Sequence, residues 1–441
     1  MSLPTPQKVE KLQTALHAKA KGSPAFRFYS LYDKMYRADV LWLAYERCRE
    51  NGGAAGVDGE TFEQIAEYGA AKWREELARE LKEKEYRASP VRRVWIEKAD
   101  GGKRPLGIPT IRDRVVQTAM LVLIEPIFEA DLEPEQYAYR QGRSAHDAVR
   151  HVHTLVNEGY SEVVDADLSG YFDTIPHSEL MKSVARRISD KQILRLIKMW
   201  LTAPVEEVDE RGTIHRTTRN KDEKRGTPQG APISPLLSNL YMRRFVLGWK
   251  RLGYAQRLGA QVVNYADDFV IYCRGGADAA AEAMRQIMDR LRVTVNEEKT
   301  RVCRLPQDSF DFLGYTIGRC YSPKTGRAYI GTRPRKKAIA AVRDRIRRLT
   351  DRRRTPRPID EQVAAINRIL IGWSNYFCLG SVSSAYHALD EYACERLRQW
   401  LRAKHKLQGR GITRYPNEYL HGEVGLVRLT ARTRRFPWAN A

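Results

Sequence analysis

The feature that most constrains this chain is a pair of adjacent carboxylates between two short apolar runs, at residues 262–272. Asp267 and Asp268 form the polar centre of this stretch, which predicts a tight β-hairpin with both acids at its turn. Adjacent carboxylates repel each other and are costly to bury unpaired. A hard divalent cation relieves that conflict, and Mg²⁺ characteristically takes one or two carboxylates plus substrate phosphates. Because Asp is also a common turn residue, the pair alone does not decide between a metal site and an ordinary turn.

A second acidic segment, VVDADLSGYFD at residues 163–173, ends an apolar run with carboxylates and continues with an aromatic pair. Phosphoryl transfer with two metal ions needs carboxylates from separate strands that meet at one point. One cation lowers the pKa of the attacking 3′-hydroxyl, and the other neutralises the leaving pyrophosphate. Asp167 from one strand, with Asp267 and Asp268 from a neighbouring hairpin, would supply that arrangement.

The composition favours a polyanionic partner. The chain has 76 Lys and Arg against 54 Asp and Glu, a net charge of +22, and excess positive charge attracts phosphate backbones. The alternative is a basic protein that its charge keeps soluble. The six cysteines form no CxxC pair and have no histidines at metal-ligand spacing, which argues against a zinc site and fits a reducing cytoplasm. No stretch approaches the roughly 18 apolar residues of a membrane span, so we expect a soluble, cytoplasmic protein with no membrane partner.

Hydrophobic periodicity predicts a fold of class α+β. Residues 91–97 alternate apolar and charged side chains as a strand, and the glycine-rich turn after them predicts a hairpin with 106–108. Ser234 and Pro235 mark a helix start, with Ser234 as the cap. Residues 1–25 are polar and are expected to be loosely ordered. Three amphipathic stripes in succession predict a basic helical domain after a mixed α/β body; they run over residues 338–349, 359–377 and 389–400.

The two acidic segments resemble motifs of reverse transcriptases. YADD at 265–268 is similar to the signature of that family, and DLSGYFD at 167–173 is similar to the partner motif, whose metal-binding Asp lies five positions before an aromatic residue. That spacing selects Asp167, with Phe172, over Asp165, which we interpret as structural. The resemblance implies a right-hand polymerase, with fingers and a palm built on antiparallel sheet, followed by an α-helical thumb or maturase domain. It also implies two Mg²⁺ ions, held by Asp167, Asp267, Asp268 and the backbone carbonyl of Leu168.

Other blocks carry expected nucleotide contacts. KADGGKRPLGIP at 98–109 resembles the fingers hairpin that closes over the incoming nucleotide, where Lys98 and Arg104, with Arg92 behind them, could hold a triphosphate. The alternative is an exposed basic hairpin. GTPQGAPISP at 226–235 resembles the block beneath the template and nucleotide, with Gln229 as the expected contact. Phe172 would lie beside the ribose and exclude a 2′-hydroxyl, or would be an ordinary core residue.

The resemblance also suggests residues for primer and template. Tyr265 of YADD and Lys299 are assigned to this role, although Lys299 could equally be a surface lysine. Asp173 is interpreted as a local hydrogen-bonding residue rather than a third metal ligand.

Further blocks resemble bacterial group II intron-encoded proteins: NGGAAGVDG at 51–59, YAYRQGR at 137–143 and IGWSNYF at 371–377, the last in a thumb-like maturase domain. This lineage implies binding to group II intron RNA. The expected RNA contacts are Arg347, Arg348, Arg352 and Arg353, which could instead form a solvated helix face. The basic, aromatic segment 408–441 suits DNA binding. Because the chain stops before any Cys/His-bearing segment, we expect a form without a C-terminal HNH nuclease domain.

The sequence therefore predicts five segments: an N-terminal extension (1–50), fingers (51–160), palm (161–332), thumb or maturase domain (333–405) and a basic DNA-binding tail (406–441). The predicted function is an RNA-directed DNA polymerase that binds its own intron RNA, assists splicing and copies the intron during retrohoming. Its other partners would be a DNA target, a primer and dNTPs. Two alternatives stay open: a reverse transcriptase of a defence or diversity-generating system, and an RNA-binding maturase that acts only in splicing.

Overall fold

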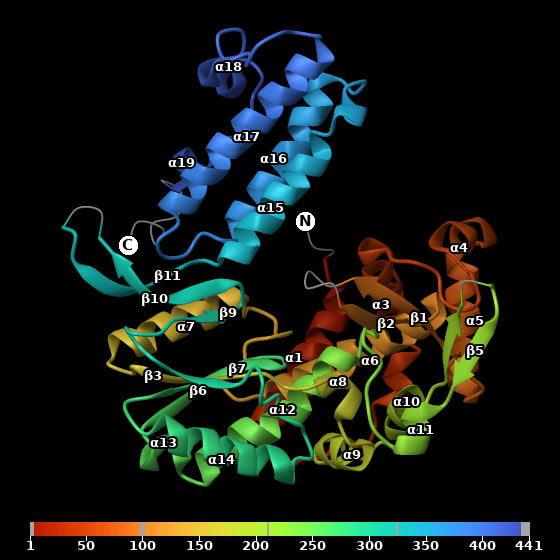
Figure 1. Cartoon of the computed structure of the whole chain (residues 1–441). Coiled ribbons are helices and arrows are strands. Elements are labelled where there is room, and N and C mark those ends of the chain that lie inside the picture. The colour runs from red at the N-terminus through yellow and green to blue at the C-terminus, as the bar shows by residue number, and fades with distance from the viewer. Residues whose placement is uncertain (1–3, 98–101, 210, 323–324, 434–441) are drawn as a thin grey trace. The chain divides into compact units, whose positions relative to one another are not determined.

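The computed structural model describes residues 4–97, 102–209, 211–322 and 325–433 (Figure 1). Contacts within the chain divide it into two compact units. Unit 1 contains residues 1–144, 166–269 and 279–300, and unit 2 contains residues 145–165, 270–278 and 301–441. Unit 1 contributes the residues of the acidic motifs from 166 to 269, and unit 2 contributes the three amphipathic stripes. The predicted combination of mixed α/β structure and a helical C-terminal part is confirmed.

Unit 1 is built around α6, whose side chains are buried over most of its length. Helices α1 and α3 pack against it. The helices that lie wholly in this unit are α1 (Gln7–Gly22), α2 (Tyr32–Met35), α3 (Ala38–Asn51), α4 (Phe62–Tyr68), α5 (Ala70–Glu83), α6 (Ile111–Glu129), α8 (Tyr171–Thr174), α9 (His177–Ala185), α10 (Lys191–Leu201), α11 (Arg219–Glu223), α12 (Ser234–Arg251) and α13 (Tyr254–Arg257). Helix α14 (Ala277–Arg290) begins within the 270–278 segment of unit 2 and ends in unit 1.

The prediction that residues 1–25 are loosely ordered is wrong, because α1 packs on α6. Val9, Leu16 and Ala20 form a narrow buried stripe on an otherwise polar helix. The contact also supplies a hydrogen-bond donor that α6 lacks, because Pro126 has no N–H to donate to the Val122 carbonyl. The side-chain amide of Gln13 donates to that oxygen at 3.0 Å. The many polar residues of this segment suggested disorder, but the segment forms a helix because its contacts with α6 stabilise it.

One sheet of unit 1 has the strand order β2-β1-β4-β5. β1 (Val91–Glu97) and β2 (Lys103–Ile108) form the predicted antiparallel hairpin, while β4 (Val205–Val208) pairs in parallel with β1 and antiparallel with β5 (Ile214–Thr217). Because side chains alternate along a strand, Ile96 projects from the same face as its partner Arg104. Trp95 projects from the opposite face with its partner Pro105. These two pairs thus lie on opposite faces of the sheet.

A second sheet has the order β6-β7-β3-β8. Its strands are β3 (Glu162–Ala166), β6 (Ala260–Tyr265), β7 (Asp268–Cys273) and β8 (Arg301–Arg304). β3 pairs antiparallel with β8, in a register that sets Asp165 opposite Arg301. The Asp165 carboxylate forms an ion pair with Arg301 at 3.3 Å, in agreement with its interpretation as a structural residue.

Ser234 begins α12 but does not cap it. The residue is the first of the helix, and its hydroxyl donates to the Pro228 carbonyl at 2.8 Å. The predicted helix start is therefore correct, whereas the predicted capping role is wrong.

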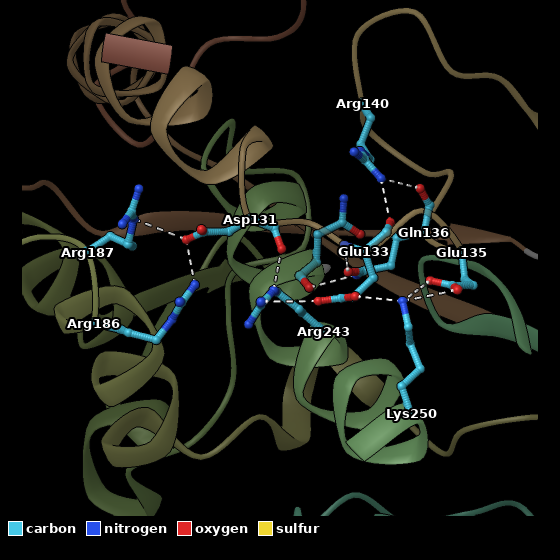
Figure 2. Close-up of polar contacts among 10 residues, drawn as sticks. Asp131, Glu133, Glu135, Gln136, Arg140, Arg186, Arg187, Arg243 and Lys250 are labelled. Carbon is cyan, nitrogen blue, oxygen red and sulfur yellow. Dashed lines mark hydrogen bonds and ion pairs between the residues drawn. The ribbon is translucent and has the colours of Figure 1, made fainter. Parts of the chain in front are cut away.

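Ion pairs anchor the loop of residues 130–144 in unit 1 (Figure 2). The Glu133 carboxylate pairs with Arg243 at 3.1 Å and with Lys250 at 2.9 Å. The buried Arg140 guanidinium donates to the carbonyl oxygens of Glu133 and Gln136, both at 2.7 Å. Because a buried ionic group is stable only with partners, these contacts hold the loop in one conformation.

Unit 2 contains the predicted helical domain. In Figure 1, α15 (Lys336–Leu349), α16 (Ile359–Tyr376) and α17 (Ser383–Lys404) lie side by side, which confirms the three stripes. The other elements of this unit, besides strands of the second sheet, are α7 (Ala145–Asn157), β9 (Phe310–Phe312), β10 (Tyr315–Tyr321), β11 (Ala328–Pro334), the 3₁₀ helix η1 (Arg352–Arg354), α18 (Asn417–Gly422) and α19 (Leu429–Arg432). Within the described ranges, no helix is both long and apolar enough to cross a bilayer.

Candidate active site

The predicted hairpin exists, with Ala266 and Asp267 as a two-residue turn between β6 and β7. Ala266 has a φ of 59°, a left-handed conformation that costs an L-residue about 1–2 kcal/mol. The side-chain amide of Asn264 donates to the Ala266 carbonyl at 2.8 Å. The backbone of Asn264 is itself bound to the 130–144 loop, through the Glu135 carbonyl and the Tyr137 N–H, both at 2.9 Å. The anchored loop therefore supports the turn that carries Asp267.

Asp167 directly follows β3, and the loop of residues 294–300 orients it. The Asn296 N–H donates to the Asp167 carbonyl at 2.8 Å, and the Asn296 side chain donates to Oδ2 of Asp167 at 3.2 Å. The Lys299 ammonium lies 3.4 Å from the same oxygen. Leu168 is buried and forms a bridge with Val295 of this loop. Asp167 thus has a defined orientation, beside the positive charge of Lys299.

Asp167 and Asp267 are close enough to interact electrostatically. The pKa of the Asp267 carboxyl is raised above its ordinary value of 3.8, and partial desolvation by neighbouring protein is the largest cause, although the residue itself is exposed to solvent. Arg104 opposes the rise and Asp167 adds to it. Asp268, the first residue of β7, is half-buried next to Asp267. This oxygen-rich donor set fits a hard divalent cation, although across the described part of the chain no three His, Cys, Asp or Glu side chains already meet at ligand spacing.

A hollow of about 520 Å³ lies in unit 1 between the face of β1 and β2 that carries Arg104 and the segment 229–235. Phe172 forms part of its wall and is 7% exposed. The Thr227 N–H donates to the Phe172 carbonyl at 2.7 Å, which fixes the aromatic residue relative to the segment beneath it. The described residues that line it are Ile96, Arg104, Leu106, Tyr139, Phe172, Gln229, Gly230, Ala231, Pro232, Ser234 and Pro235.

Gln229 and Arg104 meet directly in this hollow, since the Arg104 Nε–H donates to Oε1 of Gln229 at 3.0 Å. The backbone of Gln229 is also fixed, because its carbonyl accepts from the Gly107 N–H at 2.6 Å. A Cβ atom on Gly230 would lie 2.6 Å from the Gly107 carbonyl, so only glycine permits this approach. The two blocks in which the sequence predicts nucleotide contacts therefore touch each other through Arg104 and Gln229.

Tyr139 is a site residue that the motif analysis did not single out. It lines the same hollow in a left-handed conformation, with φ of 54°. Burial raises the pKa of its hydroxyl, and the charge on Asp267 raises it further. Tyr139 and Arg104 therefore belong to both the carboxylate site and the hollow. The YAYRQGR block pointed to this segment, but no local pattern distinguishes Tyr139 from Tyr137.

Other predicted residues lie elsewhere. Arg92 pairs with Ile108 at the other end of the hairpin, outside the described lining of the hollow. Lys98 lies outside the described residues. Tyr265 ends β6 and is half-exposed. The four predicted RNA-contacting residues are exposed in unit 2: Arg347, Arg348, Arg352 and Arg353.

Comparison with known families agrees with this geometry. Residues 96–317 match the model of the family described as "Reverse transcriptase (RNA-dependent DNA polymerase)". The chain belongs to the reverse transcriptase family. Residues 339–415 match "Group II intron, maturase-specific domain", so this reverse transcriptase carries the domain that the 371–377 block predicted. The predicted family and its group II intron branch are confirmed.

Parts of this chain are similar to individual known proteins. Protein YkfC of Escherichia coli (strain K12) is 33% identical over 75% of this chain and 93% of its own length. Group II intron-encoded protein LtrA of Lactococcus lactis subsp. cremoris is 28% identical over 66% of this chain, and the chain spans 57% of the length of that relative. Among solved structures, a chain of a partial Cas6-RT-Cas1–Cas2 complex aligns with a TM-score of 0.36 and 21% identity, over 59% of this chain and 42% of that one.

Proposed function

We propose that this reverse transcriptase is an RNA-directed DNA polymerase that binds its own group II intron RNA, assists splicing as a maturase and copies the intron during retrohoming. The observation that carries the proposal is geometric: Asp167 directly follows β3, Asp267 directly precedes the neighbouring strand β7, and a hollow lined by Phe172 and Gln229 lies in the same unit. Arg104 links the two, since it lines the hollow and favours the charged form of Asp267.

In this proposal the carboxylates of Asp167, Asp267 and Asp268, with the Leu168 carbonyl, hold two Mg²⁺ ions. When bound, the ions would activate the primer 3′-hydroxyl and neutralise the leaving pyrophosphate. The chain's own contribution is orientation: the loop of residues 294–300 fixes Asp167, and the hydrogen bond inside the β6–β7 turn fixes the backbone before Asp267.

The hollow would receive the incoming dNTP. Among the described residues that line it, Arg104 carries a positive charge and would bind phosphate oxygens through its guanidinium. Lys98 and Arg92 remain the other expected phosphate contacts, although Arg92 lies at the opposite end of the hairpin and would have to reach the phosphates from there. The Phe172 ring would occupy the space that a ribose 2′-hydroxyl needs. Tyr265 and Lys299 would contact the primer and template. Lys299 would do so from its position beside Asp167.

The remaining partners are assigned to basic surfaces. Arg347 and Arg348 on α15, with Arg352 and Arg353 on η1, would contact intron RNA. The segment 406–441 would contact target DNA, and the ribonucleoprotein would work in the cytoplasm.

Primer extension tests the polymerase assignment. The purified protein should incorporate dTTP on a poly(rA)/oligo(dT) duplex with Mg²⁺, and Asp267→Asn should reduce this to about 1% or less, because removal of one ligand of a two-metal site disables it. Both forms should bind intron RNA equally. Asp165→Asn is the matched control, since that carboxylate pairs with Arg301 instead, and it should retain most activity. A parent protein that supports splicing without dTTP incorporation would be a splicing-only maturase. A polymerase that ignores intron RNA would fit the defence or diversity-generating alternative.

A further inference from the structure

The side-chain amide of Gln229 is held at both ends. Its Oε1 accepts from Nε of Arg104 at 3.0 Å, and its Nε2 donates to Oδ2 of Asp173 at 3.1 Å. Asp173 belongs to α8, directly after Phe172. Three side chains from three separate motifs thus form one hydrogen-bonded chain that ends at a cation in the hollow.

Only one orientation of the Gln229 amide satisfies both of these hydrogen bonds. A carboxylate only accepts hydrogen bonds, and a guanidinium only donates them. Asp173 therefore directs the NH₂ end of the Gln229 amide toward itself and leaves the carbonyl end for Arg104. With the opposite amide orientation, the NH₂ group would face the N–H of Arg104 and the carbonyl would face a carboxylate. Both contacts would be lost.

Little else about Gln229 is free to change. Its backbone carbonyl accepts from Gly107, and the next residue, Gly230, packs too closely on Gly107 to tolerate a side chain. With the backbone fixed on β2, the freedom that remains lies in the side-chain torsions. The hydrogen bonds to Asp173 and Arg104 hold the amide at the end of that side chain, and the bond to Asp173 decides which end of the amide faces Arg104.

Asp173 lies outside the hollow that Gln229 and Arg104 line. It borders a separate hollow of about 680 Å³ in unit 1, whose lining also includes Arg93, Arg219 and Glu223. The Asp173 residue is exposed, so a substitution there removes no core packing. A role for Asp173 in folding and a role in orienting Gln229 can therefore be separated by experiment.

We propose that Asp173 is a positioning residue for the incoming nucleotide: by orienting the Gln229 amide, it holds the Arg104 guanidinium in the nucleotide-binding hollow. The inference rests on the proposed polymerase function and adds to it a residue that contacts neither nucleotide nor metal. Because the effect passes through Arg104, it should appear in nucleotide binding rather than in the chemical step.

Steady-state kinetics with saturating primer-template provides the test. Asp173→Ala should raise the KM for dTTP about tenfold while kcat changes less than about threefold, the pattern of lost binding common to ground and transition states. Asp173→Asn should fall between Asp173→Ala and the parent, because its Oδ1 can still accept from Gln229 but no longer dictates the amide orientation. Glu223→Gln is the matched control: Glu223 borders the same hollow but pairs with Arg219 and Arg225, so KM should be unchanged.

A double-mutant cycle identifies the route. In a Gln229→Ala background, Asp173→Ala should change KM by less than about twofold, since the intermediate group is already absent. Equal losses in both backgrounds, or an unchanged KM in Asp173→Ala alone, would overturn the inference. A parent without any incorporation would contradict the proposed function instead. The coupling would then be measured as the thermal shift caused by dTTP, and equal shifts in the parent and Asp173→Ala would refute it.

Discussion

The Asn264 side chain donates a hydrogen bond to the Ala266 carbonyl, 2.8 Å away, inside the turn that carries Asp267. Ala266 is buried in a left-handed conformation, and Asn264 is fully buried beneath it. The hydrogen bond therefore offsets part of the strain in a turn that has an alanine where glycine would be unstrained.

Asn264→Ala should destabilise the protein and impair polymerisation. It leaves the buried Ala266 carbonyl without its side-chain donor, which costs about 1–3 kcal/mol. Urea denaturation should show this loss, and kcat should fall at a temperature where the variant is still folded. In the matched variant Ala266→Gly the hydrogen bond stays and the strain disappears, so stability should be equal or higher. If Asn264→Ala unfolds at the same urea concentration as the parent, the hydrogen bond does not support the turn.

The motifs for which we predict a catalytic role could be found in the sequence because each is local. Each motif is set by residues within about ten positions of one another. They are the apolar runs around Asp267, the spacing from Asp167 to Phe172 and the glycines near Gln229. Contacts between distant segments were not predictable in this way. Nothing local indicates that residues 135–137 bind the edge of β6, or that β4 joins β1 in parallel. The positive φ of Tyr139 is likewise imposed by its surroundings. The sequence thus predicts which acids form the site, but not the contacts that orient them.

Phe172→Val should weaken the discrimination against ribonucleotides. The Phe172 side chain lines the hollow in which we propose that the dNTP binds, and a smaller residue would leave room for a 2′-hydroxyl. The ratio of kcat/KM for dTTP over UTP should fall at least about tenfold, which corresponds to roughly 1.4 kcal/mol. Tyr171→Phe is a suitable control, because it removes only the hydroxyl that bonds to the Ser238 carbonyl. An unchanged ratio in Phe172→Val would mean that this ring serves packing alone.

Gln13→Ala should destabilise unit 1, because it removes the donor to the Val122 carbonyl that Pro126 leaves unpaired in α6. Loss of a partner to a buried acceptor costs about 1–3 kcal/mol. Thr14→Ala on the same helix removes only a bond to the Glu10 carbonyl and should be nearly neutral. Thermal unfolding of both variants against the parent measures the difference, and equal melting temperatures for the two variants would contradict this account.

Asp113 should give the stability an unusual pH dependence. It is 2% exposed and accepts hydrogen bonds from the Tyr86 hydroxyl and the Ser89 N–H. Burial nevertheless raises its pKa above the ordinary 3.8. The folded state therefore binds this proton more tightly than the unfolded state, so the contribution of Asp113 to the unfolding free energy falls as pH rises from the ordinary pKa through the raised one.

Asp113→Asn removes this dependence. As pH rises through that window, the unfolding free energy of Asp113→Asn should increase relative to that of the parent, by at most about 1.4 kcal/mol per pH unit. Urea denaturation at several pH values from about 4 to 7 measures the trend. A difference between parent and variant that stays constant with pH would show that Asp113 titrates alike in both states.

The exposed arginines of α15 and η1 should make intron binding depend on salt. Asp344 is the partner of both Arg347 and Arg348, at 3.0 and 3.6 Å, so one carboxylate faces two guanidiniums. Arg352 and Arg353 follow on η1, exposed to solvent. This leaves a net positive surface that phosphates can approach, with release of their counter-ions.

Replacement of Arg347, Arg348, Arg352 and Arg353 by Gln should weaken intron binding and flatten its salt dependence. Each lost phosphate contact should reduce the slope of log K against log salt by roughly 0.7 to 0.9. A variant with Lys8, Lys11, Lys21 and Lys82 changed to Gln is the control, because these exposed residues of unit 1 carry the same total charge. Filter binding of intron RNA over a salt series should give a flatter line for the arginine variant only. If both variants keep the slope of the parent, the arginines form a solvated face; if both flatten it equally, net charge rather than this surface attracts the RNA.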